Sequence, residues 1–158
     1  MWNKFKIILD IKNDYAIINL SNDWWVYFLT MKGNTMITSA ELKNLMDYAN
    51  GTEGYTKYTF FGKSILLTDG AKLFADKAEA YWFIEEIMLC HSKLLSKSPN
   101  EYLFSISIIV KNNKARIIFK DAEKKVLEKR ISFTDCPEGT WDFYYDVESN
   151  VLMYNSEY

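Results

Sequence analysis

The run from Leu67 to Phe83 (LTDGAKLFADKAEAYWF) constrains the fold most strongly, because it joins a turn, a helix start and an aromatic pair. Its Thr68–Gly70 segment offers side-chain oxygens that can cap the free N–H groups at the start of a helix. Apolar residues then recur at helical spacing over the next seven turns or so. The pattern predicts a helix over residues 70–96, with a bend or break near Ala78–Ala80.

The periodicity changes to two after Pro99, because apolar and polar residues alternate in several short runs. Alternation of this kind predicts strands, and the Asn112–Asn113 pair between two of the runs is typical of a tight hairpin turn. The expected strands are Tyr102–Val110, Lys114–Lys120, Lys125–Phe133, Trp141–Val147 and Val151–Asn155. Short connections between them favour an antiparallel meander sheet, packed against the helix of residues 70–96.

The sequence of the first third of the chain predicts smaller elements. The pattern is interrupted near Gly33–Ile37, and we call this interruption the seam. Three strands are expected before the seam, the first two forming a β-hairpin: Phe5–Ile11, Tyr15–Leu20 and Trp24–Thr30. After the seam, Thr38 and Glu41 have the spacing of a capping box and predict a short helix. Two further runs, Tyr55–Phe61 and Ser64–Leu67, are interpreted as extended.

The expected fold class is therefore α+β, in a single domain over residues 1–158. Residues 1–35 form an N-terminal β extension and residues 37–158 form the core. A length of 158 residues suits one domain that buries most of its apolar surface. Aromatic residues make up 16% of the chain, more than a small core needs, so some of the Tyr and Trp side chains are expected at an interface.

Charge is unevenly distributed toward the end of the chain. Residues 111–133 carry eight Lys or Arg against three acids, whereas residues 134–158 carry six acids and no Lys or Arg. Such asymmetry can mark a partner surface, or it can reflect a sheet whose neighbouring strands form salt bridges. The basic candidates are Lys114, Arg116 and Lys120, which share one strand face by parity, extended by Lys125 and Lys129 from the next strand. This patch suits an RNA backbone or an acidic protein surface.

The acidic end interleaves carboxylates with rings. By parity, Trp141, Phe143 and Tyr145 share one strand face. The candidate partner-binding residues are Asp142, Tyr144 and Asp146 on the other face, with Tyr154, Glu157 and Tyr158 beyond them. Two interpretations stay open, namely an amphipathic last hairpin and an acidic surface with Tyr anchors that competes for a basic groove.

Catalytic machinery is not apparent. His91, the one histidine, follows Cys90 directly, and neighbours on a helix point about 100° apart, so the two do not form a dyad. No metal site, cofactor or catalytic residue is expected. The alternative is a small carboxylate-dependent hydrolase, whose candidate ligands are Asp69, Asp76, Glu79, Glu85 and Glu86.

The cellular location of the protein is predicted from three features that the sequence does not show: a signal peptide, a membrane-spanning stretch and a CxxC pair. No signal peptide is visible, and the longest membrane-like stretch, Trp24–Leu29, is far shorter than the roughly 18 apolar residues of a spanning helix. Cys90 and Cys136 lie far apart in sequence and form no CxxC pair, which favours free thiols in a reducing compartment. We expect a cytoplasmic protein that does not enter a membrane.

Four short motifs carry a family resemblance over residues 37–158. They are Thr68-Asp69-Gly70, Ala80-Tyr81-Trp82, Thr134-Asp135 followed by Pro137, and Ser156-Glu157-Tyr158. In their order and spacing the chain resembles a family of small bacterial proteins of mobile elements, known only as a domain of unknown function. The resemblance supplies no catalytic residues, and it implies a cytosolic protein of phage or plasmid context.

This resemblance leads to a functional expectation. Phages and plasmids carry many small proteins that block host defences, so we expect a non-enzymatic inhibitor that binds a host effector protein. The specific expectation is an anti-CRISPR protein acting on an RNA-guided nuclease or on its RNA complex. The alternative is an RNA-binding or regulatory module that uses the basic hairpin of residues 111–130.

Overall fold

The structure is a computed structural model that describes the backbone of residues 6–11, 14–19 and 30–31, together with residues 37–122 and 124–158. The chain divides into two compact units, residues 1–36 and 37–158, at the seam expected from the sequence. The assignment of both units to one domain stays a prediction.

The first unit contains a β-hairpin of β1 (Lys6–Ile11) and β2 (Asp14–Asn19), and a two-residue strand β3 (Thr30–Met31) pairs with β2. The hairpin was predicted from the sequence and is confirmed. Apart from Thr30, the expected strand Trp24–Thr30 lies outside the described residues.

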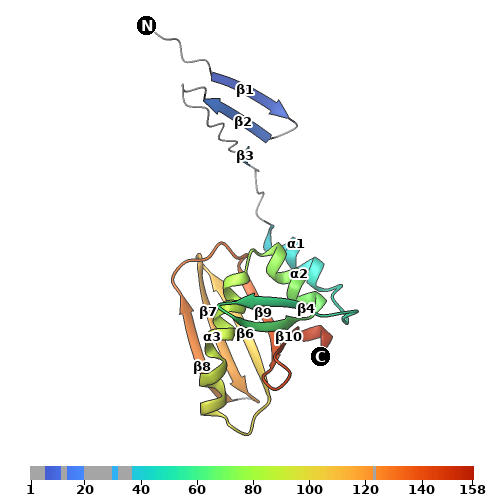
Figure 1. Ribbon diagram of the computed structural model, residues 1–158, viewed down its shortest axis with the longest axis vertical. Coiled ribbons are helices and arrows are strands. Elements are labelled where there is room, and N and C mark those ends of the chain that lie inside the picture. Colours follow the sequence, from blue (N-terminus) through green and yellow to red (C-terminus); the bar gives the residue numbers. More distant parts are fainter. Residues whose placement is uncertain (1–5, 12–13, 20–29, 32–36, 123) are drawn as a thin grey trace. The chain divides into compact units, whose positions relative to one another are not determined.

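The second unit combines helices with a seven-stranded sheet (Figure 1), so the predicted α+β class is confirmed. Its helices are α1 (Ser39–Met46), α2 (Asp69–Lys77), α3 (Tyr81–Lys97) and the short 3-10 helix η1 (Asn155–Glu157). Its strands are β4 (Thr56–Phe60), β5 (Lys63–Leu67), β6 (Leu103–Lys111), β7 (Lys114–Asp121), β8 (Lys124–Ile131), β9 (Gly139–Asp146) and β10 (Val151–Tyr154).

Helix boundaries follow the capping signals in the sequence. Thr38 and Glu41 form the predicted capping box at the start of α1, and the Thr68 side chain caps α2. The expected break of the long helix is also confirmed, because α2 ends at Lys77 and α3 begins at Tyr81. Glu79 between them has a φ of 50°, a left-handed conformation that cannot continue an α-helix.

Two pairings in the sheet depart from a simple meander. The order is β4-β5-β10-β9-β6-β7-β8, so β9 pairs with β6 and not with its predecessor β8. The last strand, β10, lies between β9 and β5 and pairs with β5 in parallel. Only β6, β7 and β8 form a true meander, because the connection of residues 132–138 carries the chain back to the other side of β6.

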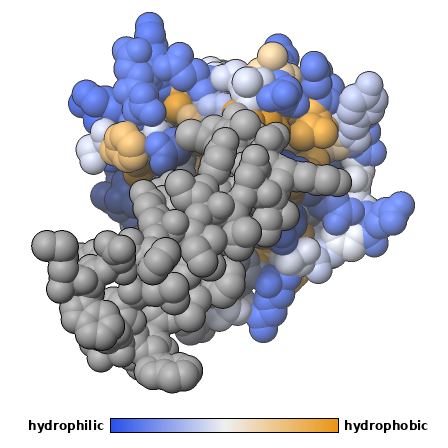
Figure 2. Space-filling model, turned by 90° about the horizontal axis from the view of Figure 1, so that it is seen from above, coloured by the Kyte–Doolittle hydropathy of each residue, from blue (hydrophilic) through white to orange (hydrophobic). Residues whose placement is uncertain are grey.

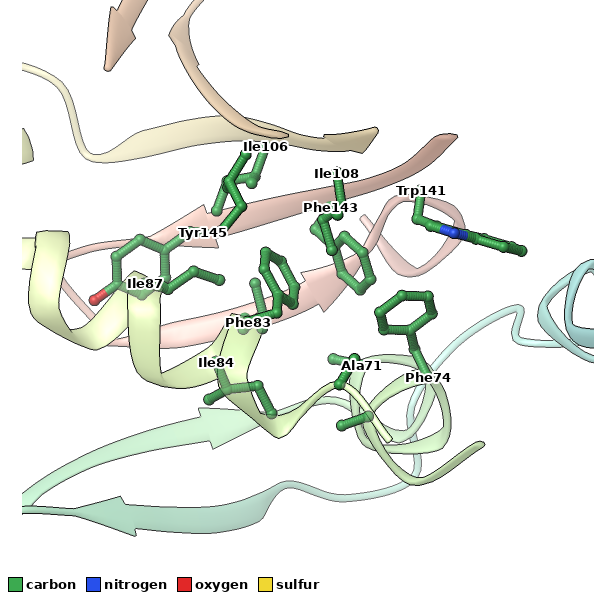
Figure 3. Packing of buried hydrophobic residues seen from close by; sticks show 14 of the residues in the cluster. Ala71, Phe74, Phe83, Ile84, Ile87, Ile106, Ile108, Trp141, Phe143 and Tyr145 are labelled. Atoms are coloured by element: carbon green, nitrogen blue, oxygen red, sulfur yellow. The ribbon is translucent and has the colours of Figure 1, made fainter. Parts of the chain in front are cut away.

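The core lies between the sheet and helices α2 and α3, and a cluster of rings occupies its centre (Figure 3). Phe143 of β9 has its ring centroid 5.1 Å from that of Phe74 on α2 and 4.9 Å from that of Phe83 on α3. On α3, Ile84 and Ile87 are fully buried and Trp82 is partly buried. One face of the sheet is therefore covered by helices α2 and α3.

Candidate functional site

One face of strands β6, β7, β8 and β9 packs against helices α2 and α3. We call the opposite face of these four strands, with its side chains, the open face. The pairing register orders them into cross-strand rows, because directly opposed residues share a face. One row runs Thr140, Ile109, Arg116, Arg130, the next Asp142, Ser107, Ile118, Glu128, and the third Tyr144, Ser105, Lys120, Lys125. All of these side chains are exposed or half-buried, whereas the alternate residues Ala115, Ile117 and Phe119 on β7 are buried.

Cations on the open face gather around one carboxylate, Glu128. Its Oε1 accepts hydrogen bonds from Nε of Arg116 (3.1 Å) and Arg130 (3.2 Å), and its Oε2 accepts one from Nζ of Lys125 (3.0 Å). These bonds from Lys125, Arg116 and Arg130 lower the pKa of Glu128 to about 2, so it stays ionised at any physiological pH. Lys114 and Lys120 on the same face have no ion pair among the described residues.

Lys129 does not join this face, which corrects the parity argument. The register shifts between Phe119 and Lys120, so that Phe119 opposes Leu127 while Lys120 opposes Lys125. The extra residue on β8 reverses the alternation, as a β-bulge does. Lys129 therefore lies on the helix side, where its Nζ is 3.1 Å from Oε2 of Glu86 on α3. Arg130, which the sequence argument missed, takes its place on the open face.

Two tyrosines meet at the β9 end of the open face. The ring of Tyr144 lies 4.7 Å from that of Tyr158, centroid to centroid, and Tyr158 is 72% exposed. Asp142 in the neighbouring row accepts a 2.6 Å hydrogen bond from the hydroxyl of Ser107 on β6. The structure thus places Asp142, Tyr144 and Tyr158 at the β9 end of the open face, and β6 separates them from the cations of β7 and β8.

Asp146 and Tyr154, two other residues of the acidic end, serve the fold. Asp146 accepts hydrogen bonds from the backbone N–H groups of Glu148 (2.9 Å) and Ser149 (3.0 Å) and from the Ser149 hydroxyl, which closes the turn after β9. Burial opposes ionisation of Asp146, but these bonds outweigh it and lower its pKa. Tyr154 points into the core, with its ring 5.4 Å from that of Phe143.

Glu157 forms what we call the C-terminal latch with Thr68 and Gly70. Its Oε1 accepts a hydrogen bond from the N–H of Gly70 (2.8 Å), and its Oε2 accepts one from the Thr68 hydroxyl (2.5 Å) and one from the N–H of Tyr154 (3.1 Å). A carboxylate at the first turn of α2 also interacts favourably with the positive end of the helix dipole. Glu157 was expected to contact a partner, but all three bonds are internal.

The latch unites two of the motifs on which the family resemblance rests, Thr68–Gly70 and Ser156–Tyr158. Ser156 adds a hydrogen bond from its hydroxyl to the carbonyl oxygen of Ala49. Tyr81, from a third motif, donates a 2.5 Å hydrogen bond to Asp76 across the α2–α3 break. These motif residues hold the fold together, and of the residues in these three motifs Tyr158 alone is also placed on the open face.

Gly70→Ala is expected to destabilise the protein by about 1–3 kcal/mol, because a Cβ there overpacks the latch. The added atom would lie 2.6 Å from Oε2 of Glu157 and 3.0 Å from Cβ of Tyr154. The clash outweighs the gain of roughly 1 kcal/mol that alanine brings to a helix interior. Thermal unfolding followed by circular dichroism measures the loss. Gly54→Ala is the matched control, since no atom lies within 4 Å of its Cβ, and an equal loss in both variants would contradict the latch.

His91 and Cys90, the residues considered for catalysis, have different surroundings. His91 Nδ1 lies 2.7 Å from the Tyr145 hydroxyl, which itself donates to Asn150 Oδ1 (2.6 Å), so Nδ1 carries the proton. Burial lowers the pKa of His91, and the charge of Lys63 adds to this effect. Burial raises the pKa of the Cys90 thiol. Within the described residues no group of three or more His, Cys, Asp or Glu is arranged to hold a metal ion.

Four of the five carboxylates weighed as metal ligands, namely Asp69, Asp76, Glu85 and Glu86, each have a different neighbour. Asp69 accepts a hydrogen bond from the N–H of Glu53 (2.9 Å), and Asp76 pairs with Lys72. Glu85 accepts a 2.8 Å bond from the Tyr58 hydroxyl, and Glu86 faces Lys129. The structure does not bring these acids to one place.

The surface of residues 37–158 visible in Figure 2 is mainly hydrophilic, with hydrophobic side chains showing in limited areas. Among the helices in the described part of the chain, none has the length and apolar character needed to cross a membrane.

Comparison with known proteins gives one match. No curated protein and no solved structure matches the chain significantly. Residues 40–158 match a family described as a family of unknown function, DUF6876. The match covers the whole seven-stranded sheet and helices α1, α2 and α3, apart from Ser39, the first residue of α1. The resemblance to a domain of unknown function is thereby confirmed, and the chain belongs to this family.

Proposed function

We propose that the protein is a non-enzymatic inhibitor that binds a host defence effector, and that this effector is an RNA-guided nuclease with its RNA. The observation that carries the proposal is the open face. It combines cations, among them Lys114, Arg116, Lys120, Lys125 and Arg130, with the exposed Tyr158 and the half-buried Tyr144, on one side of a sheet whose other side packs against helices. The mobile-element context implied by the family resemblance supplies the class of target.

The composition of the open face supports macromolecular binding in three respects. Tyr and Arg are the residue types that contribute most to binding energy at interfaces. Arg116 and Arg130 are held by Glu128, so their positions are partly fixed before a partner arrives. A sheet backed by a packed core also changes shape little on binding, which reduces the entropy lost.

A cleavage assay tests the proposal. Purified protein is added in excess to a panel of RNA-guided nucleases loaded with their guide RNAs, and cleavage of target nucleic acid is followed on gels. We expect at least one nuclease to be inhibited, and the triple variant Lys114→Glu, Arg116→Glu, Lys120→Glu to lose that inhibition, because it reverses the charge of β7 on the open face.

The matched control changes three exposed lysines in the helical layer, Lys43→Glu, Lys77→Glu and Lys93→Glu, which alters the net charge equally. Inhibition should survive in this variant. Undiminished cleavage across the whole panel would overturn the proposed function, and equal loss of inhibition in both triple variants would remove the open face from it.

A further inference from the structure

We propose that the open face binds single-stranded RNA, with bases stacked on Tyr158 and Tyr144 and phosphates held by Lys120, Lys125 and Arg116. The choice of RNA rests on the proposed function, because an RNA-guided effector carries RNA, and is supported by the hydroxyl of Ser105. The way in which the strand would be bound follows from the residues of the third cross-strand row, which are Tyr144, Ser105, Lys120 and Lys125.

The third row places rings and cations at opposite ends of one line. Tyr144 lies opposite Ser105, Ser105 opposite Lys120, and Lys120 opposite Lys125. Neighbouring strands are ~4.8 Å apart, so the row spans roughly 14 Å across four strands. A few nucleotides can cross that distance, with bases at the tyrosine end and phosphates at the lysine end.

The tyrosine pair favours unpaired bases over an acidic protein. Tyr158 is 72% exposed and lies against Tyr144 with an interplanar angle of 39°, so one ring supports the other. A supported, exposed ring is the stacking platform that single-strand binding proteins use, and stacking accepts any base because each has a π-face. A duplex hides these faces inside its stack, and an acidic peptide offers a ring only where its sequence includes an aromatic residue.

Charge on the open face favours a polyanion. Six cations share this face with three carboxylates, because Lys111 opposes Lys114 and Asp146 lies on the same side of β9 as Asp142. All three carboxylates already have partners: Asp142 with Ser107, Asp146 with the turn after β9, and Glu128 with three of the cations. Lys114 and Lys120 have no ion pair among the described residues. Binding of phosphates would release counterions from the strand, which makes the affinity strongly dependent on salt.

Ser105 supplies the feature that suits RNA. It is half-buried in the middle of the row, where its backbone pairs with Tyr144 on one side and Lys120 on the other. Its hydroxyl can exchange a hydrogen bond with a ribose 2′-hydroxyl, the group by which proteins distinguish RNA from DNA. In the neighbouring row, by contrast, the Ser107 hydroxyl is committed to Asp142.

Fluorescence anisotropy with a labelled 12-nucleotide single-stranded RNA tests the inference on the full chain. We expect salt-dependent binding, weaker for DNA of the same sequence and for duplex RNA. Tyr158→Ala should weaken binding roughly 5- to 150-fold, the range for loss of one stacked base. Tyr158→Trp should retain it, because indole also stacks. Lys120→Ala with Lys125→Ala should flatten the slope of log affinity against log salt by about 0.7 for each phosphate that these lysines no longer neutralise.

The control pair is Lys77→Ala with Lys93→Ala, which removes two charges from the helical layer and should leave the salt slope unchanged. Tyr158 is exposed, so its variants should fold normally, and a thermal melt checks this. The inference is overturned by absent RNA binding at low salt, by unchanged binding in Tyr158→Ala, or by equal affinity for DNA or for an acidic peptide.

The two proposals fail separately. Inhibition of a nuclease without RNA affinity in the isolated protein would overturn the RNA inference and leave the proposed function in place. RNA affinity that follows the tyrosine and lysine variants, without inhibition of any nuclease, would support the RNA inference and overturn the proposed function.

Discussion

Replacing Phe143 by alanine is expected to lower the free energy of unfolding by about 3–5 kcal/mol, the range for a fully buried phenylalanine. Phe143 is 1% exposed on the central strand β9, and its ring contacts the rings of Phe74, Phe83 and Tyr154. The cavity would therefore adjoin both helices and the end of β10, and it cannot be closed by movement of one neighbour. Urea unfolding followed by circular dichroism measures the loss.

Phe133→Ala is the matched control, because Phe133 is 65% exposed in the connection between β8 and β9. We expect that variant to change the stability by at most about 0.5 kcal/mol. Equal losses in the two variants would mean that the ring cluster of Figure 3 is not the centre of the core.

Replacing Glu157 by alanine is expected to cost about 2–4 kcal/mol, because three donors lose a charged acceptor. The N–H of Gly70, the N–H of Tyr154 and the Thr68 hydroxyl would all need new partners, and Thr68 is only 1% exposed to water. Glu157→Gln should cost less, because one amide oxygen still accepts a bond while the favourable charge at the helix start is lost. Differential scanning calorimetry gives both values.

Glu148→Ala controls for the loss of one acid, since Glu148 is exposed in the turn after β9. A double-mutant cycle between Glu157→Ala and Thr68→Ala isolates the direct interaction. If the two substitutions add without coupling, the latch does not exist in solution.

Local signals in the sequence predicted the elements well. The capping box of Thr38, the break near Ala78–Ala80 and the hairpin turn at Asn112–Asn113 all depend on residues a few positions apart. Both asparagines of that turn have positive φ, 51° and 55°, as a two-residue hairpin turn requires. The position of β10 was not predictable in this way, because its parallel pairing with β5 leaves no turn signal between them.

The candidate site was predicted only in part, for two physical reasons. Parity placed Lys114, Arg116 and Lys120 correctly, but the bulge on β8 exchanged Lys129 for Arg130, and no residue type marks a bulge of this kind in advance. Glu157 looked like an available acid because its donor Gly70 lies 87 positions away in the sequence. Charge composition alone cannot distinguish a carboxylate that meets a partner from one that caps a helix.

The placement of β10 has a consequence for how the protein folds. The β4–β5 hairpin joins the rest of the sheet only through β10, where Thr68 and Leu152, 84 positions apart, are hydrogen-bonded. Closing so long a loop costs entropy before any favourable pairing can form. The pairing of β5 with β10 should therefore form after the local hairpins. Until residues 151–154 are in place, β5 and β9 both have unpaired edges, and such edges are where partly folded chains associate with each other.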